Sequence, residues 1–245
     1  MRIVLPPSET KQPGGVDKTL AWDSLVLPQV GDVRRGIATD LVALCGDEVA
    51  ASKALGLGTK GAEWIQANRE LESAPVMPAL TRYTGVLFDA LDYGSLDKDA
   101  QSRADQTVWL FSALFGPLRA TDLIPRYRLS FDSKLPGESL KSRWQGHAEE
   151  IWAGDFTVDL RSEGYRSLAP LPAGAGVYVR VVKDLAGGAA AGHANKATKG
   201  RLVQDLLTGD VQVSSRDELL DALARLGWSV AAVDGEEHEI ALAAG

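Results

Sequence analysis

The sequence predicts an α/β fold, α+β in the broader sense, built as one domain over residues 1–245 with a mixed sheet flanked by helices. Strand-like and helix-like patterns interleave along the whole chain, as they do in proteins whose helices cover a sheet. Hydrophobic residues make up 45% of the chain, which is enough for a sizeable core. The chain has no internal repeat, and its Gly/Ala-rich stretch at residues 185–194 is too short to separate two domains.

The first half of the chain predicts one strand followed by several helices. An apolar run at residues 3–5 leads directly into a loop dense in Pro, Gly and Ser, as at the end of a buried strand. Polar loops at the carboxyl ends of strands commonly hold ligands. Apolar spacing and cap residues predict the helices. They cover residues 33–49 with a break at Gly46 and Asp47, 63–71 capped by Thr59, 86–91 after Gly85, and 100–104 capped by Asp97.

The second half predicts most of the sheet. β-branched, aromatic and alternating patterns indicate strands at residues 107–111, 127–131, 156–160 and 176–182. Residues 228–233 and 238–242 flank Asp234 and Gly235, which is a hairpin signal. Helices are predicted at residues 139–152, at 195–207, and from a cap at Ser214 or Ser215 to residue 226.

Charge and cysteine content limit the possible partners and compartment. The chain has 26 Lys and Arg against 33 Asp and Glu, a formal net charge of −7, so any nucleic acid or anionic ligand must be held by a local basic surface. A single cysteine can close no internal disulfide, which fits a reducing cytosol. The start of the chain lacks a signal-peptide core, and no apolar run approaches the roughly 20 residues of a membrane span. We therefore expect a cytoplasmic protein with no membrane partner.

Common catalytic and cofactor motifs are missing from the sequence. It contains no P-loop, no dinucleotide-binding glycine fingerprint and no nucleophile elbow. Three histidines and one cysteine form no cluster with metal-ligand spacing, so we expect no metal and no cofactor. A carboxylate metal site is the alternative at the acidic residues near the end of the chain, Asp234, Glu236, Glu237 and Glu239, but such a cluster is typical of a solvated turn. Cys45 is open to interpretation as a peroxide sensor, but its place on an apolar helix face favours simple packing.

Two basic clusters are the strongest candidates for binding anions. Arg119, Arg126 and Arg128 surround a glycine turn that could present backbone N–H groups to a phosphate. The alternative is that these arginines pair with Asp122 or Asp132 and are structural. In the second cluster, Lys196 and Lys199 lie three residues apart at the start of a predicted helix, so both ammonium groups share one face. Solvated lysines are the alternative there.

Five motifs occur in the order and spacing of a known family. They are LPPSETK at residues 5–11, LFGPLR at 114–119 with PRYRL at 125–129, WQG at 144–146, DLRSEGY at 159–165, and KATKG at 196–200. In these motifs the chain resembles the YaaA family of bacterial peroxide-stress proteins, from the first strand to the terminal hairpin.

The resemblance implies an α/β domain with a basic cleft and a helix-hairpin-helix-like element. It implies binding to double-stranded or branched DNA, protection of that DNA from oxidative damage, and a link to limiting free intracellular iron. By resemblance, residues 116–118 form the hairpin turn. The residues implied to line the cleft are Lys11, Arg119, Tyr127, Arg128, Ser162, Lys196 and Lys199. No catalytic residue is implied, so an enzyme is the less favoured interpretation.

A small-molecule enzyme or binder is the alternative function. The same basic residues could hold a phosphate- or carboxylate-bearing ligand in a concave site. Ser8, Thr10, Ser162 and Tyr165 would then orient the ligand or transfer protons, with Glu163 as a base. The shape of the surface separates the two functions, because a duplex needs an open groove whereas a metabolite needs a closed pocket.

Overall fold

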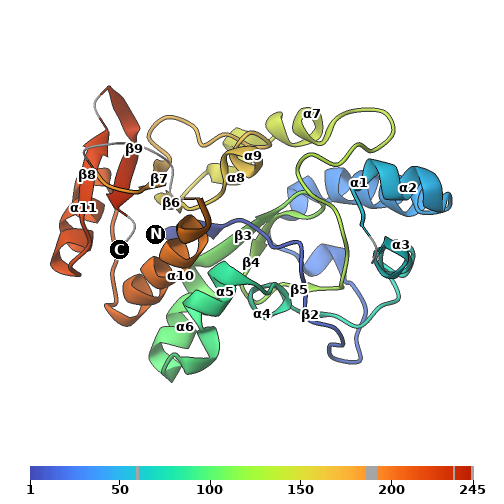
Figure 1. The fold of residues 1–245 in the computed structure, drawn as a ribbon, viewed down its shortest axis with the longest axis horizontal. Coiled ribbons are helices and arrows are strands. Elements are labelled where there is room, and N and C mark those ends of the chain that lie inside the picture. The colour runs from blue at the N-terminus through green and yellow to red at the C-terminus, as the bar shows by residue number, and fades with distance from the viewer. Residues whose placement is uncertain (59–60, 186–191, 234, 244–245) are drawn as a thin grey trace.

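A seven-stranded mixed sheet forms the centre of the computed structural model, which describes residues 1–58, 61–185, 192–233 and 235–243 (Figure 1). Its inner five strands run parallel, and the two edge strands run antiparallel to their neighbours. In spatial order the strands are β4 (Gly116–Arg119), β3 (Val108–Ser112), β1 (Arg2–Leu5), β6 (Thr157–Asp159), β7 (Gly176–Val182), β9 (Glu236–Ala243) and β8 (Val230–Val233). A separate antiparallel pair joins β2 (Met77–Pro78) to β5 (Leu123–Ile124). The predicted mixed sheet is confirmed.

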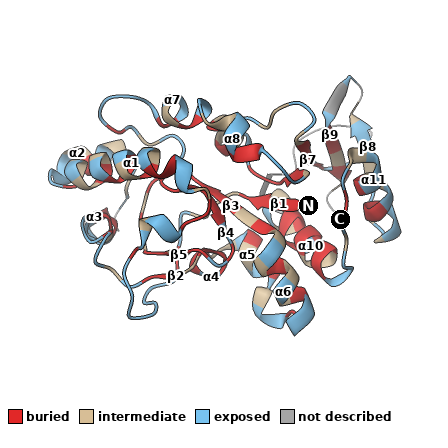
Figure 2. Cartoon of the chain, turned by 180° about the vertical axis from the view of Figure 1, so that it is seen from behind, coloured by how far each residue is buried: buried red, intermediate tan, exposed pale blue. Residues whose placement is uncertain are grey.

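Helices cover both faces of this sheet. The α-helices of the described residues are α1 (Gly31–Leu44), α2 (Glu48–Ala54), α3 (Gly61–Arg69), α4 (Ala79–Arg82), α5 (Val86–Leu91), α6 (Lys98–Thr107), α7 (Leu140–Gln145), α8 (Ala148–Trp152), α9 (Glu163–Arg166), α10 (Gly192–Thr208) and α11 (Arg216–Arg225). Figures 1 and 2 agree that α7 and α8 lie on one side of β1 and β3, and that α5, α6 and α10 lie on the other. Figure 2 also shows that the buried residues gather on the strands and on the helix sides that face them.

Capping side chains begin the helices where the sequence predicts them. The Asp47 carboxylate accepts hydrogen bonds from the backbone N–H groups of residues 49 and 50, both at 3.0 Å, and starts α2. Asp97 accepts from the Ala100 N–H at 2.8 Å and starts α6. Ser215 caps α11 in the same way. These bonds satisfy N–H groups that have no partner within the helix. Thr59, Asp234 and most of the Gly/Ala-rich stretch lie outside the described residues.

The structure corrects the helix-hairpin-helix interpretation of residues 116–118. These residues belong to β4, which pairs with β3 in the register Ser112 to Gly116 and Trp109 to Arg119. Gly116 has φ of 61°, and a Cβ added there would overlap the Trp144 ring, so close packing requires this glycine. Gly116, which the sequence predicts to lie in a phosphate-binding turn, is therefore a structural residue of the β-hairpin formed by β3 and β4.

The predicted strand at residues 127–131 is also wrong, because this segment is an extended loop. The Asn68 side chain makes the backbone hydrogen bonds that a neighbouring strand would otherwise make. Its amide donates to the Arg128 carbonyl at 2.9 Å, and its Oδ1 accepts from the Arg128 N–H at 2.8 Å. The long helix predicted at residues 139–152 is divided into α7 and α8.

The Gly116→Ala variant is expected to lower the free energy of unfolding by about 2 to 3 kcal/mol. Alanine is unfavourable in the left-handed backbone conformation of this position, and its Cβ would overlap the Trp144 ring. The indole N–H of Trp144 donates to the Ala113 carbonyl at 2.9 Å, which holds the ring in place. Urea unfolding followed by circular dichroism measures the change. Gly36→Ala is the matched control, because an added Cβ there meets nothing within 4 Å and alanine favours the helix. Equal effects of the two substitutions would contradict this account.

Candidate functional site

A pocket lies where the direction of the strand connections reverses. After β1 the chain continues to β3, which neighbours β1 towards one edge of the sheet, whereas after β6 it continues to β7, which lies towards the other edge, and β1 and β6 are neighbours. Such a reversal leaves a crevice at the carboxyl ends of the two strands, which is a common ligand site in parallel sheets. The crevice holds a cavity of about 520 Å³ lined by Pro6 and Pro7 after β1 and by Leu160 and Ser162 after β6. We call it the switch-point pocket.

The switch-point pocket combines apolar walls with many polar side chains. Aromatic and aliphatic walls come from α5, from Tyr165 on α9, and from Phe131, whose ring packs edge-on against Tyr165 at 5.4 Å. Helix α10 contributes Asn195, Lys196 and Lys199. Serine and threonine hydroxyls line the pocket at Ser8, Thr10, Thr84, Ser130 and Ser162. A pocket of this composition suits an organic ligand that carries an anionic group.

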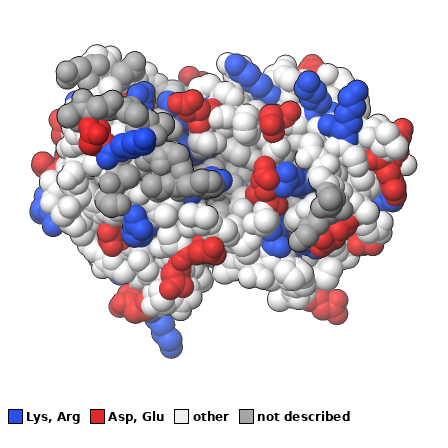
Figure 3. Space-filling view, in the orientation of Figure 1, with Lys and Arg blue, Asp and Glu red and all other residues white. Residues whose placement is uncertain are grey.

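A second hollow of about 580 Å³ adjoins the switch-point pocket, because Glu9 and Ser130 line both. We call the two hollows together the groove. The charged residues that line the groove are Lys53, Arg128, Lys134, Lys196 and Lys199, together with Glu9 and Asp132. The lining thus contains five Lys and Arg residues and two carboxylates, whereas the chain as a whole has a net charge of −7. Figure 3 shows Lys and Arg interspersed with Asp and Glu over the visible face rather than gathered into one basic surface.

Lys199 is the buried cation of the pocket, with only 3% of the residue exposed. Its ammonium donates to the Arg161 carbonyl at 3.2 Å and lies 5.3 Å from the centre of the Tyr178 ring. The pKa of Lys199 is lowered from 10.5 to about 8, chiefly by burial; the nearby cation of Arg166 contributes to the shift, whereas the carboxylates of Asp159 and Glu163 oppose it. Among the described residues, none forms a direct ion pair with this ammonium.

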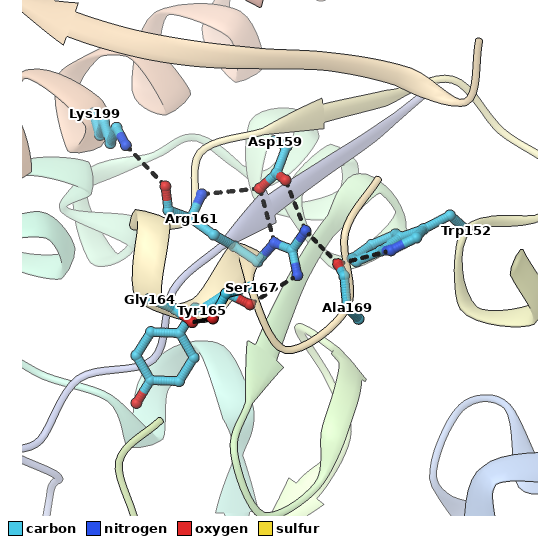
Figure 4. A network of polar contacts seen from close by, with 8 residues as sticks. All are labelled: Trp152, Asp159, Arg161, Gly164, Tyr165, Ser167, Ala169 and Lys199. Carbon is cyan, nitrogen blue, oxygen red and sulfur yellow. Dashed lines mark hydrogen bonds and ion pairs between the residues drawn. The ribbon is translucent and has the colours of Figure 1, made fainter. Parts of the chain in front are cut away.

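The loop that carries Ser162 is fixed by a buried ion pair (Figure 4). The Arg161 guanidinium donates to both carboxylate oxygens of Asp159, at 2.9 and 2.8 Å, and both side chains are fully buried. It also donates to the carbonyls of Tyr165 and Ala169, at 3.2 and 2.9 Å. The pair therefore holds the Arg161 carbonyl, which receives the Lys199 hydrogen bond, in place.

Comparison with known proteins identifies the family. The family model described as peroxide stress protein YaaA matches residues 1–232. The chain belongs to the YaaA family of peroxide stress proteins. A UPF0246 protein of Corynebacterium efficiens is 40% identical to this chain over 251 residues, 99% of each protein. A UPF0246 protein of Streptomyces coelicolor is 39% identical over 240 residues, 95% of this chain and 92% of the relative. The resemblance read from the five motifs is confirmed, and the family supports an oxidative-stress role for this chain.

The structure brings three of the residues implied by the YaaA resemblance together in the switch-point pocket. Lys196 and Ser162 are exposed at its lining, and Lys199 is buried in its wall. Arg128 lies in the adjoining hollow, where it forms an ion pair with Glu9 at 3.0 Å. Of the groups named for the alternative function, Ser8, Thr10 and Tyr165 line the pocket, while Glu163 is not part of the lining.

Two other residues implied by the YaaA resemblance are buried. The Lys11 ammonium lies 4.2 Å from the centre of the Tyr127 ring and donates to the Ser8 carbonyl at 2.8 Å. Burial lowers the pKa of Lys11 well below its usual value, and the neighbouring Arg128 cation adds to the shift. The Tyr127 hydroxyl is hydrogen-bonded to Ser112 at 2.6 Å and to Tyr83 at 2.7 Å. Lys11 thus ties the loop after β1 to the core.

The remaining arginines of the first basic cluster lie apart from the pocket. Arg119 is exposed on β4 opposite Trp109, towards the amino end of β3, whereas the pocket lies at the carboxyl end of the sheet. Arg126 forms an ion pair with Glu63 at 2.6 Å. Asp122, one proposed partner, instead accepts from the Arg119 backbone N–H at 3.0 Å.

Sequence reasoning missed three polar groups of the groove. Lys53 and Lys134 belong to segments with no recognisable motif, and only the tertiary fold brings them together. The buried Oδ1 of Asn195 has no hydrogen-bond partner among the described residues, although it lines the pocket. The only signal for Asn195 in the sequence is its position at the start of the lysine-bearing helix.

Other expectations concern metals, membranes and the cysteine. The described residues contain no group of three or more His, Cys, Asp or Glu that would hold a metal ion. No helix within them has both the length and the apolar character needed to cross a bilayer. Cys45 is fully buried in the core, and burial raises the pKa of its thiol, so its packing role is the one that the structure supports.

Proposed function

We propose that this YaaA-family protein acts in peroxide stress by binding double-stranded or branched DNA along the groove. Bound protein would protect the DNA from oxidative damage, and the limitation of free iron belongs to the same proposed cellular role. The observation that carries the proposal is the groove lining, where five Lys and Arg side chains accompany two carboxylates in a chain of net charge −7. A local excess of cations is what binding to phosphates requires of an acidic protein.

Three exposed lysines are the phosphate contacts in this proposal. Lys53 lies at the end of α2, Lys134 in the loop before α7, and Lys196 on α10, so together they line both hollows of the groove. An ammonium on a flexible stem serves as a point charge for phosphate and carries no base specificity. The proposal therefore predicts binding that is largely independent of DNA sequence.

The Lys53→Ala/Lys134→Ala/Lys196→Ala variant is expected to bind DNA more weakly and with a smaller dependence on salt. Losing three phosphate contacts should make the slope of log affinity against log salt shallower by about 2 to 3. Fluorescence anisotropy with labelled duplex and four-way junction DNA across a salt series measures both quantities. The matched control removes three exposed lysines outside the groove, Lys18, Lys98 and Lys141. Absence of binding by the unmodified protein even at low salt would overturn the proposal.

The second candidate function is binding of a small phosphate- or carboxylate-bearing molecule in the switch-point pocket. The position of the pocket between β1 and β6 and its apolar walls favour this candidate. Lys199 adds a buried cation to this lining. The Lys199→Met variant separates the two candidates, because it removes the buried ammonium and leaves the three exposed lysines in place.

A further inference from the structure

The Lys199 amine has hydrogen-bonding capacity that the described protein groups do not fill. An ammonium has three N–H donors, and the Arg161 carbonyl accepts one of them at 3.2 Å. The carboxylate of Asp159 is nearby, but its two oxygens already accept from the Arg161 backbone N–H and guanidinium. Since Lys199 also lines the switch-point pocket, the unfilled positions of its nitrogen are available to a ligand there.

The surroundings of Lys199 favour its neutral form more than water does. The charged and titratable groups around it are Asp159 on β6, Arg161 and Glu163 after β6, Arg166 on α9, and Tyr178 on β7. Burial dominates over the two carboxylates and lowers the pKa of Lys199 to about 8, so about a tenth of the amine is neutral at pH 7. A neutral lysine amine in a desolvated pocket is a nucleophile.

Lys196 supplies a second cation three residues earlier on α10. Residues at this spacing share one helix face, and both lysines line the pocket. Lys196 is exposed, so its side chain is hydrated until a ligand arrives. The pocket thus combines a buried amine, an exposed cation and apolar walls, which together suit a small carbonyl compound with a carboxylate or phosphate.

We propose that Lys199 forms a reversible imine with an aldehyde or ketone whose anionic group is bound by Lys196. The proposal rests on the second candidate function above and specifies its ligand chemistry. The neutral Nζ attacks the carbonyl carbon, a C–N bond forms, and a proton passes from nitrogen to oxygen to give a carbinolamine. The carbinolamine then loses its hydroxyl group and the remaining N–H proton together as water, which gives the C=N bond. Imine formation neither consumes nor releases electrons, so it needs no oxidant or reductant.

Reductive trapping with glyoxylate tests the proposal. The full chain is incubated with glyoxylate and sodium cyanoborohydride, which reduces only the imine, and the modified lysines are counted by peptide mass spectrometry. We expect Lys199 to be trapped at least about tenfold faster at pH 7 than the exposed Lys18, Lys98 and Lys141 in the same tube. The trapping rate should rise with pH to a midpoint near 8. Reaction of Lys199 no faster than the exposed lysines, or a midpoint near 10.5, would overturn it.

Two variants separate this chemistry from adventitious labelling and from DNA binding. Lys199→Met should abolish trapping at this position, with circular dichroism reporting that the variant is folded. Lys196→Ala should slow trapping of glyoxylate but leave trapping of neutral propionaldehyde unchanged, whereas equal slowing of both would contradict the anion-binding role. DNA binding without selective trapping would overturn this inference alone, and selective trapping without DNA binding would overturn only the groove proposal.

Discussion

Replacing Arg161 with Met is expected to lower the free energy of unfolding by about 3 to 5 kcal/mol. The substitution leaves the Asp159 carboxylate fully buried without its bidentate partner, and removing one member of a buried ion pair is more destabilising than removing both. It also removes the donors that satisfy the carbonyls of Tyr165 and Ala169. Urea unfolding at pH 7 measures the loss.

Arg35→Met is the matched control for this prediction. Arg35 also forms an ion pair, with Asp23 at 2.6 Å, but the two side chains are 41% and 91% exposed. An exposed pair contributes at most about 1 kcal/mol, so the same substitution should change stability little. The Asp159→Asn/Arg161→Met double variant should recover part of the stability lost in Arg161→Met, because it removes the stranded charge. A loss at Arg161 no larger than at Arg35 would show that burial of the pair contributes nothing.

The same ion pair connects fold stability to the candidate site. Arg161 lies two residues after the end of β6, and its backbone carbonyl is the acceptor for Lys199. Its side chain points the other way, into the core, where the guanidinium carbon lies 4.4 Å from the centre of the Trp152 ring. One residue therefore anchors the loop through its guanidinium and fixes the pocket amine through its carbonyl. Mutation of Arg161 should weaken both the fold and the pocket, whereas mutation of Lys199 should alter the pocket without weakening the fold.

Local signals in the sequence were sufficient to predict most of the elements. Asp47, Asp97 and Ser215 act on N–H groups two or three residues away, so a cap can be recognised without knowing the fold. The two wrong predictions depend on distant partners. Gly116 is required by the Trp144 ring, and the loop at Arg128 is paired by Asn68, 60 residues earlier. Such contacts leave no periodic pattern in the sequence.

The candidate site was predictable only where its residues share a segment. Lys196 and Lys199 lie on one helix, so their convergence follows from helical spacing, and the structure places both at one pocket. Lys53 at the end of α2 and Lys134 in the loop before α7 reach the groove from separate segments, and nothing in the sequence predicts that they meet. The burial of a side chain is equally hard to predict, because nothing in the local sequence distinguishes the buried Lys11 from the exposed Lys196. The crossover directions of β1 and β6, which create the pocket, are a property of the whole sheet.

The Lys199→Met variant is expected to be more stable than the unmodified protein at pH 7, by up to about 3 kcal/mol. Burial lowers the pKa of Lys199 from 10.5 to about 8 in the folded state, so the folded chain carries the cost of a buried ammonium whenever both states are protonated. Methionine fills a similar volume without that charge. A residue that lowers stability where it stands is typical of a site kept for function rather than for folding.

The pH dependence of this gain distinguishes charge burial from better packing. Below pH 8 the folded and unfolded chains both hold the Lys199 proton, and the full gain is present. Between pH 8 and 10.5 the unfolded chain binds more protons, so the unmodified protein gains stability as pH rises and the advantage of Lys199→Met shrinks. Urea unfolding of both proteins from pH 6 to 10 measures the difference, with exposed Lys98→Met as the control. An advantage that stays constant over this range would mean that Lys199 is not buried as a cation.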